Sequence, residues 1–131
     1  MFIPNAPAES YWEGEWKFPR TGTTVSIAIA IAGSEDGPFP ETREFLLGVP
    51  PRFDQIIQTL RPRLADLFRA WLDQELPADI FKVVKLAGLS VDDPRIRPIH
   101  WDISFEAIGD KWLGIVIPFS GDEAQEAIVD T

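Results

Sequence analysis

The stretch "PIHWDISFEAIGDKWLGIVIPF", residues 98–119, decides the fold expected for this chain. In both halves, large apolar residues alternate with polar or small ones, which is typical of strands that bury one face. Gly109 and Asp110 supply turn chemistry between the halves. The stretch therefore predicts an antiparallel hairpin, with Glu106 opposite Trp112 and His100 opposite Pro118. The two apolar rows that would face the core are Ile99, Trp101, Ile103 and Phe105, and Leu113, Ile115, Ile117 and Phe119.

A second hairpin is predicted near the start of the chain. The segment "YWEGEWKF", residues 11–18, also alternates, and "PRTG" provides a turn before "TTVSIAIAIAG", residues 23–33. In residues 25–32, bulky β-branched residues occupy one face and only Ser and Ala the other. The small face suggests close approach by a loop or a second copy of the chain. A central strand beside bulkier neighbours is the alternative.

The middle of the chain predicts helices. A long apolar stripe at steps of three and four runs from Phe53 to Leu72, with Pro50 and Pro51 in its first turn. Because the stripe keeps its phase across Pro62, one kinked helix is expected. Shorter helices are predicted over residues 41–47 and 78–86, the latter ending near Gly88. Residues 126–130, "EAIVD", could add a short edge strand.

This order of elements predicts an α+β fold in two layers. We expect a mainly antiparallel sheet of four to five strands, with two or three helices on one face and the order ββααββ. Residues 1–10 are expected to form a flexible N-terminal arm, and residues 11–131 a single domain. With 131 residues, the chain is long enough to bury most of its apolar surface.

Charge and composition narrow the classes of function. The chain has 21 acidic and 12 basic residues, for a formal charge of −9. Such a surface disfavours nucleic acid and anionic membranes and attracts a basic protein. With no cysteine and one histidine, thiolate catalysis and the usual zinc sites are not expected. We expect no metal or cofactor, no membrane span, and a cytoplasmic location.

The polar face admits two catalytic interpretations. His100, Asp102 and Ser104 share one face of a strand, but neighbours two apart lie about 6.6 Å apart at the backbone, too far for a hydrolytic relay. Glu13 and Glu15 could share the solvent face with Asp102 and Glu106 if the two hairpins are neighbours. A pair of carboxylates could then serve glycoside hydrolysis; a solvated polar face is the alternative.

Trp112 is the residue on the predicted solvent-exposed face of this hairpin that is least typical of a surface position. It would stand beside Gly114, where the missing side chain leaves room next to the indole. A partly exposed tryptophan among carboxylates is the composition of a protein-binding hot spot. Alternatively, Phe2 and Ile3 of the N-terminal arm fold over it.

The C-terminal third, "IHWDISFEAIGDKWLGIVIPFSGDEAQEAIVDT", resembles small bacterial domains of unknown function grouped with immunity proteins of polymorphic toxin systems. Trp101–Asp102 and Leu113–Gly114 carry the resemblance, whereas Lys111–Trp112 stand where those domains have Glu-His. The resemblance implies a non-enzymatic, acidic protein that masks a toxin.

The leading interpretation is a non-catalytic binding domain with an acidic sheet face that holds a basic protein. A small hydrolase using a carboxylate pair is one alternative. A homodimeric structural or accessory protein, associating through the small face of residues 26–32, is the other. The residues expected to bind the partner are Glu13, Glu15, His100, Asp102, Glu106 and Trp112.

Overall fold

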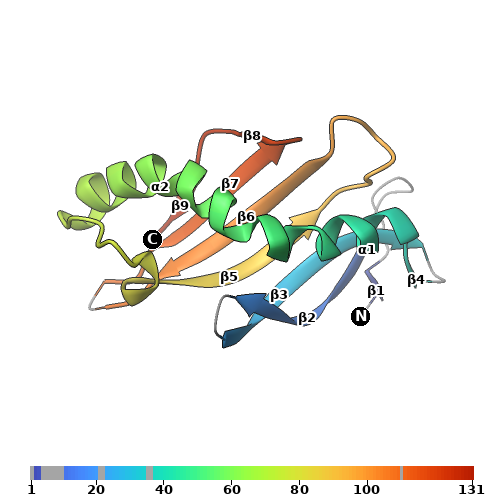
Figure 1. The fold of residues 1–131 in the computed structure, drawn as a ribbon, viewed down its shortest axis with the longest axis horizontal. Helices are drawn as coiled ribbons and strands as arrows, with labels where there is room; N and C mark the ends of the chain where they lie inside the picture. Colours follow the sequence, from blue (N-terminus) through green and yellow to red (C-terminus); the bar gives the residue numbers. More distant parts are fainter. Residues whose placement is uncertain (1, 4–10, 21–22, 35–36, 110) are drawn as a thin grey trace.

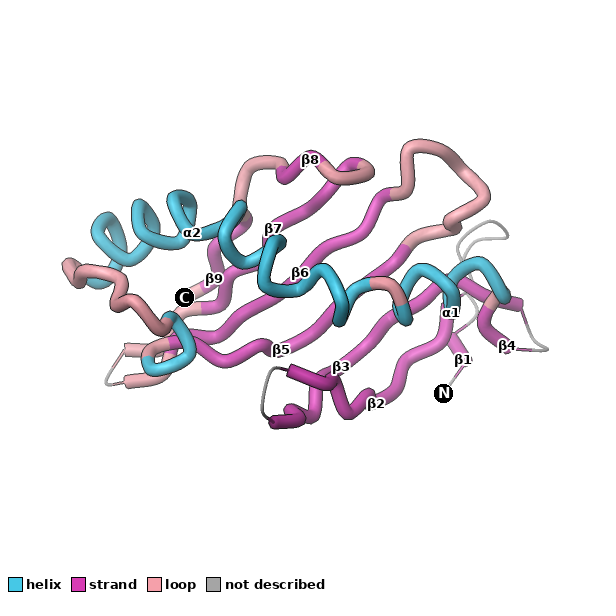
Figure 2. The backbone as a smooth tube through the Cα atoms, in the orientation of Figure 1, coloured by secondary structure: helices cyan, strands magenta, loops and turns pink. Residues whose placement is uncertain are grey.

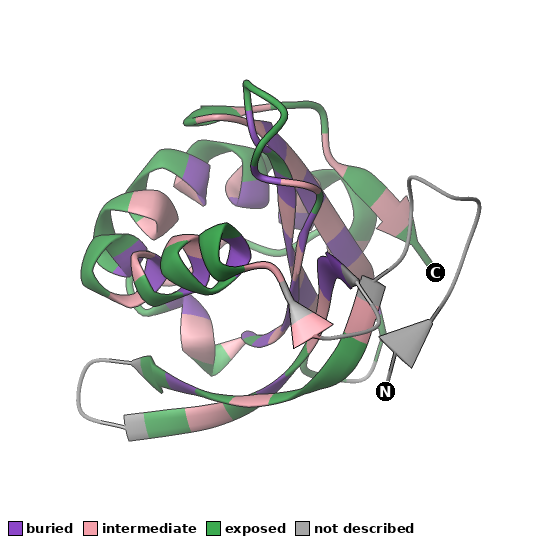
Figure 3. Cartoon of the chain, turned by 90° about the vertical axis from the view of Figure 1, so that its right-hand side faces the viewer, coloured by how far each residue is buried: buried purple, intermediate pink, exposed green. Residues whose placement is uncertain are grey.

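The computed structural model describes residues 2–3, 11–20, 23–34, 37–109 and 111–131. In these residues, nine strands form one sheet, and the helices lie against one face of it (Figure 1). Viewed from the side, the opposite face of the sheet is free of helices (Figure 3). The strands are β1 (Phe2–Ile3), β2 (Tyr11–Arg20), β3 (Thr23–Ser34), β4 (Gly37–Pro38), β5 (Val84–Val91), β6 (His100–Ala107), β7 (Gly114–Ser120), β8 (Glu123–Ala124) and β9 (Ile128–Asp130).

The sheet follows the order β1-β2-β3-β5-β6-β7-β8, with β4 beside β3 and β9 beside β7. All pairs are antiparallel except β3 and β5, which run parallel. The two helices belong to the crossover that joins this parallel pair (Figure 2). The predicted α+β class with a mainly antiparallel sheet is confirmed, and the sheet has more strands than the four to five expected.

Both predicted helices around the proline-rich segment are present. Helix α1 spans Pro40–Leu47, and helix α2 spans Val49–Leu72 with Pro62 inside it. An internal proline costs about 3 kcal/mol, because it removes a hydrogen bond and crowds the preceding turn. Leu60 and Leu64 are fully buried on either side of Pro62, and their burial offsets that cost. The prediction of one helix rather than two is confirmed.

The predicted third helix over residues 78–86 is wrong. Only a 3₁₀ turn, η1 (Ile80–Lys82), forms there, and the following residues are strand β5. A bulge between Leu86 and Gly88 shifts the register against β6. The positions of the large buried side chains are therefore spaced two, three and two apart, which hides the strand period. These positions are Val84, Leu86, Leu89 and Val91.

The core lies between the helices and one face of the sheet. Stripes from α1 and α2 pack on the apolar rows of β2, β3, β5, β6 and β7. Trp101 stacks on Phe119 with 4.3 Å between ring centroids, and its indole nitrogen donates to the Gly121 carbonyl at 2.8 Å. The polar atom of this large side chain is thus satisfied within the fold.

The last hairpin forms with the predicted faces but a different register. Glu106 pairs with Gly114 and His100 with Ser120, two residues beyond the predicted partners. The amide of Ala107 donates to the Leu113 carbonyl, so Trp112 belongs to the connecting loop. Because the shift is an even number, both apolar rows still face the core. Asp110, in the predicted turn, lies outside the described residues.

Candidate functional site

The candidate site is the sheet face opposite the helices, which we call the open face. The strand register aligns its side chains in rows that cross the sheet. One row runs from Glu13 through Ala30 and Ser90 to Asp102 and Pro118. The next row consists of Glu15, Ala28, Gly88, Ser104 and Val116.

The middle of the open face is a shallow hollow of about 600 Å³. Its floor is formed by small residues of three strands, so no side chain rises above the backbone by more than a few atoms. Gly88 is required there, since a Cβ atom would lie 2.8 Å from the Ala28 carbonyl oxygen and 3.1 Å from Ser104 Oγ. The floor residues are Ala28, Ala30, Gly88, Ser90 and Ser104.

Carboxylates border this floor on two sides. Glu13 and Glu15 are exposed on β2, while Asp102 and Glu106 are partly buried on β6. The Glu106 carboxylate is paired with Lys85 Nζ at 3.2 Å, so part of its charge is already neutralised. A cation entering the hollow would meet acids on both of its borders.

Asp102 is electrostatically unusual among these acids. Burial raises the pKa of the Asp102 carboxyl above its usual range, and the nearby charge of Asp92 raises it further. A hydrogen bond from Ser90, the residue directly opposite, lowers the pKa in part. A positive ligand group beside Asp102 would favour its ionised form.

Trp112 lies where the open face meets the loop before β7. A Cβ atom on Gly114 would fall 2.9 Å from Cη2 of the Trp112 ring, so the indole lies directly over this glycine. Trp112 is 48% exposed. The backbone of Phe2 and Ile3 pairs with β2, at the other end of the strand order. The alternative in which these two residues cover the indole is therefore wrong.

Apolar side chains extend the surface around Trp112. Val116 and Pro118 share the open face of β7, and Ile128 lies opposite Val116 and is 60% exposed. The open face thus combines a small-residue floor, acidic borders and an apolar side. Protein interfaces likewise contain both apolar and polar surface.

The structure does not assemble either catalytic arrangement considered above. Strands β3 and β5 lie between β2 and β6, so Glu13 and Asp102 are about 14 Å apart at the backbone. The hairpins are not neighbours as the carboxylate-pair hypothesis required, although their acids do share one face. The Asp102 carboxylate accepts a hydrogen bond from Ser90, and His100 lies at the end of β6 opposite Ser120.

The floor residues of β5, Gly88 and Ser90, were not predicted, because a helix over residues 78–86, ending near Gly88, was expected where β5 begins. The apolar extension made by Val116 and Ile128 was not predicted either. The alternation in "VVKLAGLSV" was the available signal, but the bulge interrupts it.

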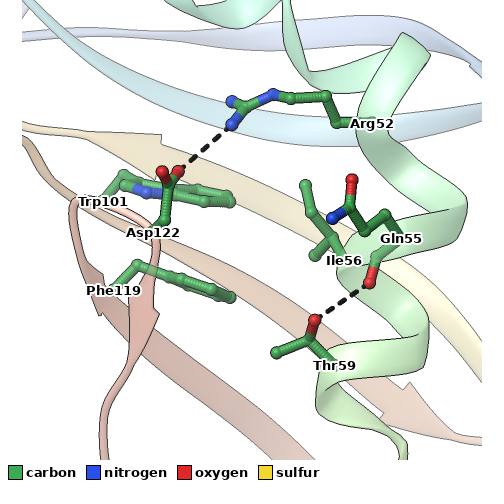
Figure 4. A pocket seen from close by; sticks show the side chains of 7 residues that line it. All are labelled: Arg52, Gln55, Ile56, Thr59, Trp101, Phe119 and Asp122. Atoms are coloured by element: carbon green, nitrogen blue, oxygen red, sulfur yellow. Dashed lines mark hydrogen bonds and ion pairs between the residues drawn. The ribbon is translucent and has the colours of Figure 1, made fainter.

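A second hollow of about 250 Å³ lies on the helix side, between α2 and the ends of β6 and β7 (Figure 4). The stacked rings of Trp101 and Phe119 form one wall and Ile56 faces them from the helix. Arg52 reaches across to Asp122 at 3.2 Å. Both rings are at most 4% exposed, so the hollow offers a ligand little surface. We interpret it as a packing gap bridged by the ion pair.

The described part of the chain contains no group of three or more histidine, aspartate or glutamate side chains that could share a metal ion. Within the same residues, neither α-helix combines the length and apolarity needed to cross a membrane. No protein-family model, curated protein or solved structure matches this chain.

Proposed function

We propose that this protein is a non-catalytic binding domain whose open face holds a basic protein. The observation that carries the proposal is the hollow itself, a floor of small residues bordered by acids on β2 and β6. Basic side chains of a partner can approach the backbone there and meet the carboxylates of β2 or those of β6. Trp112 and its apolar neighbours would contact the uncharged part of the partner.

The charge of the whole chain supports the same partner class. A formal charge of −9 attracts a cationic protein over a distance set by the ionic strength. Exposed charges are screened within about 8–10 Å at 0.1–0.15 M salt, so association should weaken as salt rises. This behaviour would suit the role implied by the resemblance to immunity proteins, which is to mask a partner by occupying its basic surface.

The test is capture of partners from the native host by purified protein at low and high salt, followed by titration of the purified partner. The altered form carries Glu13→Lys, Asp102→Lys and Glu106→Lys. Its matched control carries Glu41→Lys, Glu44→Lys and Asp66→Lys, which give the same change in net charge on exposed positions of the helices. Circular dichroism confirms that each form is folded.

We expect one basic protein to bind wild type and the control, and to lose at least tenfold in affinity for the open-face variant. Trp112→Ala should cost about 2 kcal/mol of binding if the indole is a hot spot. Binding should also weaken as the pH is lowered, because Asp102, with its raised pKa, takes up a proton early. An equal loss of affinity in the open-face variant and in the control would show that only net charge matters and would refute a binding site on this face.

A further inference from the structure

A different surface, the outer edge of β2, has no strand beside it over most of its length. Strand β2 pairs with β3 along all ten residues, from Tyr11 to Arg20. On its other side, β1 reaches only Tyr11 and Trp12. Within the described residues, the outer edge of residues 14–20 therefore faces no other strand, and β2 borders the sheet in Figure 1.

An unpaired edge of this length is a template for another strand, because its outward amides and carbonyls are available for hydrogen bonds. The side chains along this edge alternate between two faces. Glu13, Glu15 and Lys17 are exposed on the open face. Trp16 is half-buried on the helix side, against Phe18.

We propose that two copies of the chain associate edge to edge through β2, antiparallel, with Trp16 on the two-fold axis. Trp16 would then lie opposite its own copy. Glu15 would lie opposite Lys17 on both sides of the axis, and Gly14 opposite Phe18. Opposite charges directly across an antiparallel pair are stabilising, and aromatic residues facing each other add to this.

Charge complementarity selects this register over its neighbours. Centring the pair on Glu15 places two glutamates in contact, and centring it on Lys17 places two lysines in contact. Centring it on Gly14 opposes Glu13 to Glu15 twice. Like charges directly opposite each other are destabilising. Of these four registers, which all keep the helices of both copies on one side, only the Trp16-centred one has opposite charges and no like pair.

Two features of β2 act against pairing. Lysine and proline protect edges from unwanted pairing, and this strand contains Lys17 and Pro19. In the proposed register, however, Lys17 meets a carboxylate, and Pro19 lies near the end of the contact, opposite Glu13. β2 as a whole has two acidic and two basic residues, so the edge is neutral although the chain carries a charge of −9.

The test measures molecular mass by sedimentation equilibrium, from micromolar to near-millimolar protein. Three variants are compared with wild type: Glu15→Lys, Lys17→Glu, and the double exchange of both. Glu44→Lys on α1 is the control for charge, and Ala30→Arg tests association through the small face. All replaced side chains are at least partly exposed, so the fold should be retained.

We expect a monomer–dimer equilibrium for wild type, Glu44→Lys and Ala30→Arg. Each single exchange on β2 should weaken association about tenfold or more, because two opposite-charge pairs become two like-charge pairs. The double exchange should restore it, since each position again meets its opposite charge. In the Glu15-centred register, the double exchange would place Glu13 opposite a new glutamate at position 17. It would therefore create new like-charge pairs and could not restore association.

A monomer at all concentrations would overturn the proposal. So would a dimer that the single exchanges leave intact, or that Ala30→Arg abolishes. Failure of the double exchange to restore association would refute the register. Partner capture is tested separately, with the variant at Glu13, Asp102 and Glu106, so a failure of the dimer proposal leaves the proposed function standing.

Discussion

The two faces of this sheet are formed by the same strands but differ in almost every side chain. On β6, Ile103 and Phe105 are at most 1% exposed beneath the helices, while Ser104 between them borders the hollow of the open face. Bulky residues fill the helix side because every void there would cost contacts. The open face carries small and acidic residues, and no helices pack against it. It is therefore the face on which a binding surface can be built without loss of the core.

The largest effect expected from this difference is a loss of stability on the helix side. Ile103→Ala should lower the free energy of unfolding by about 3 kcal/mol, because it leaves a cavity in a fully buried position. Ser104→Ala, its neighbour on the open face, should change stability by less than about 0.5 kcal/mol. Urea unfolding measures both. Similar losses at the two positions would mean that the open face is packed like a core.

Gly88 is expected to be the exception on the open face. Gly88→Ala should cost about 1–3 kcal/mol, because the new methyl group meets the Ala28 backbone at 2.8 Å and must separate β3 from β5. Ala30→Ser, on the same floor, adds an oxygen without such a contact and serves as the control. If Gly88→Ala is as stable as wild type, β3 and β5 can move apart at Gly88 and Ala28 without loss of stability.

A smaller effect is expected at Asp102, and its sign depends on pH. Because the pKa is raised in the fold, the ionised carboxyl costs stability at neutral pH, and this cost disappears once the group is protonated in both folded and unfolded states. Asp102→Asn should therefore stabilise the fold at neutral pH by less than about 1 kcal/mol, since water still screens the half-exposed group. The gain should vanish at low pH in thermal unfolding. A gain independent of pH would contradict this explanation.

The parts of the fold that could be predicted are those with an unbroken period. The hairpin of β2 and β3, helix α2 and the facing rows of β6 and β7 all follow from regular spacing of apolar residues. The register of the last hairpin could not be predicted, because an even shift preserves the faces and the pattern cannot distinguish the two pairings. The hydrogen bond from the Ala107 amide to the Leu113 carbonyl closes the connection in the observed register.

Strand β5 could not be predicted because one bulge changes the spacing of its buried residues. Without β5, the two hairpins appear to be neighbours, and the acids of β2 and β6 appear close enough to act as a pair. The hollow also depends on β5, since Gly88 lies in its floor and meets Ala28 across the parallel pair of β3 and β5. The shared face of the acids on β2 and β6 could thus be predicted from the sequence, whereas the floor residues of β5 and the distance between the acids could not.

That parallel pair also has a consequence for how the chain folds. Ala28 meets Gly88, sixty positions later, whereas β2 with β3 and β6 with β7 pair across short turns. Closing the long segment costs more chain entropy than closing a hairpin, and non-local pairing slows folding. We therefore expect the two hairpins to form early and the β3–β5 contact to form late. Until β5 enters the sheet, the facing edges of β3 and β6 remain unpaired, and aggregation during refolding should be greatest at this stage.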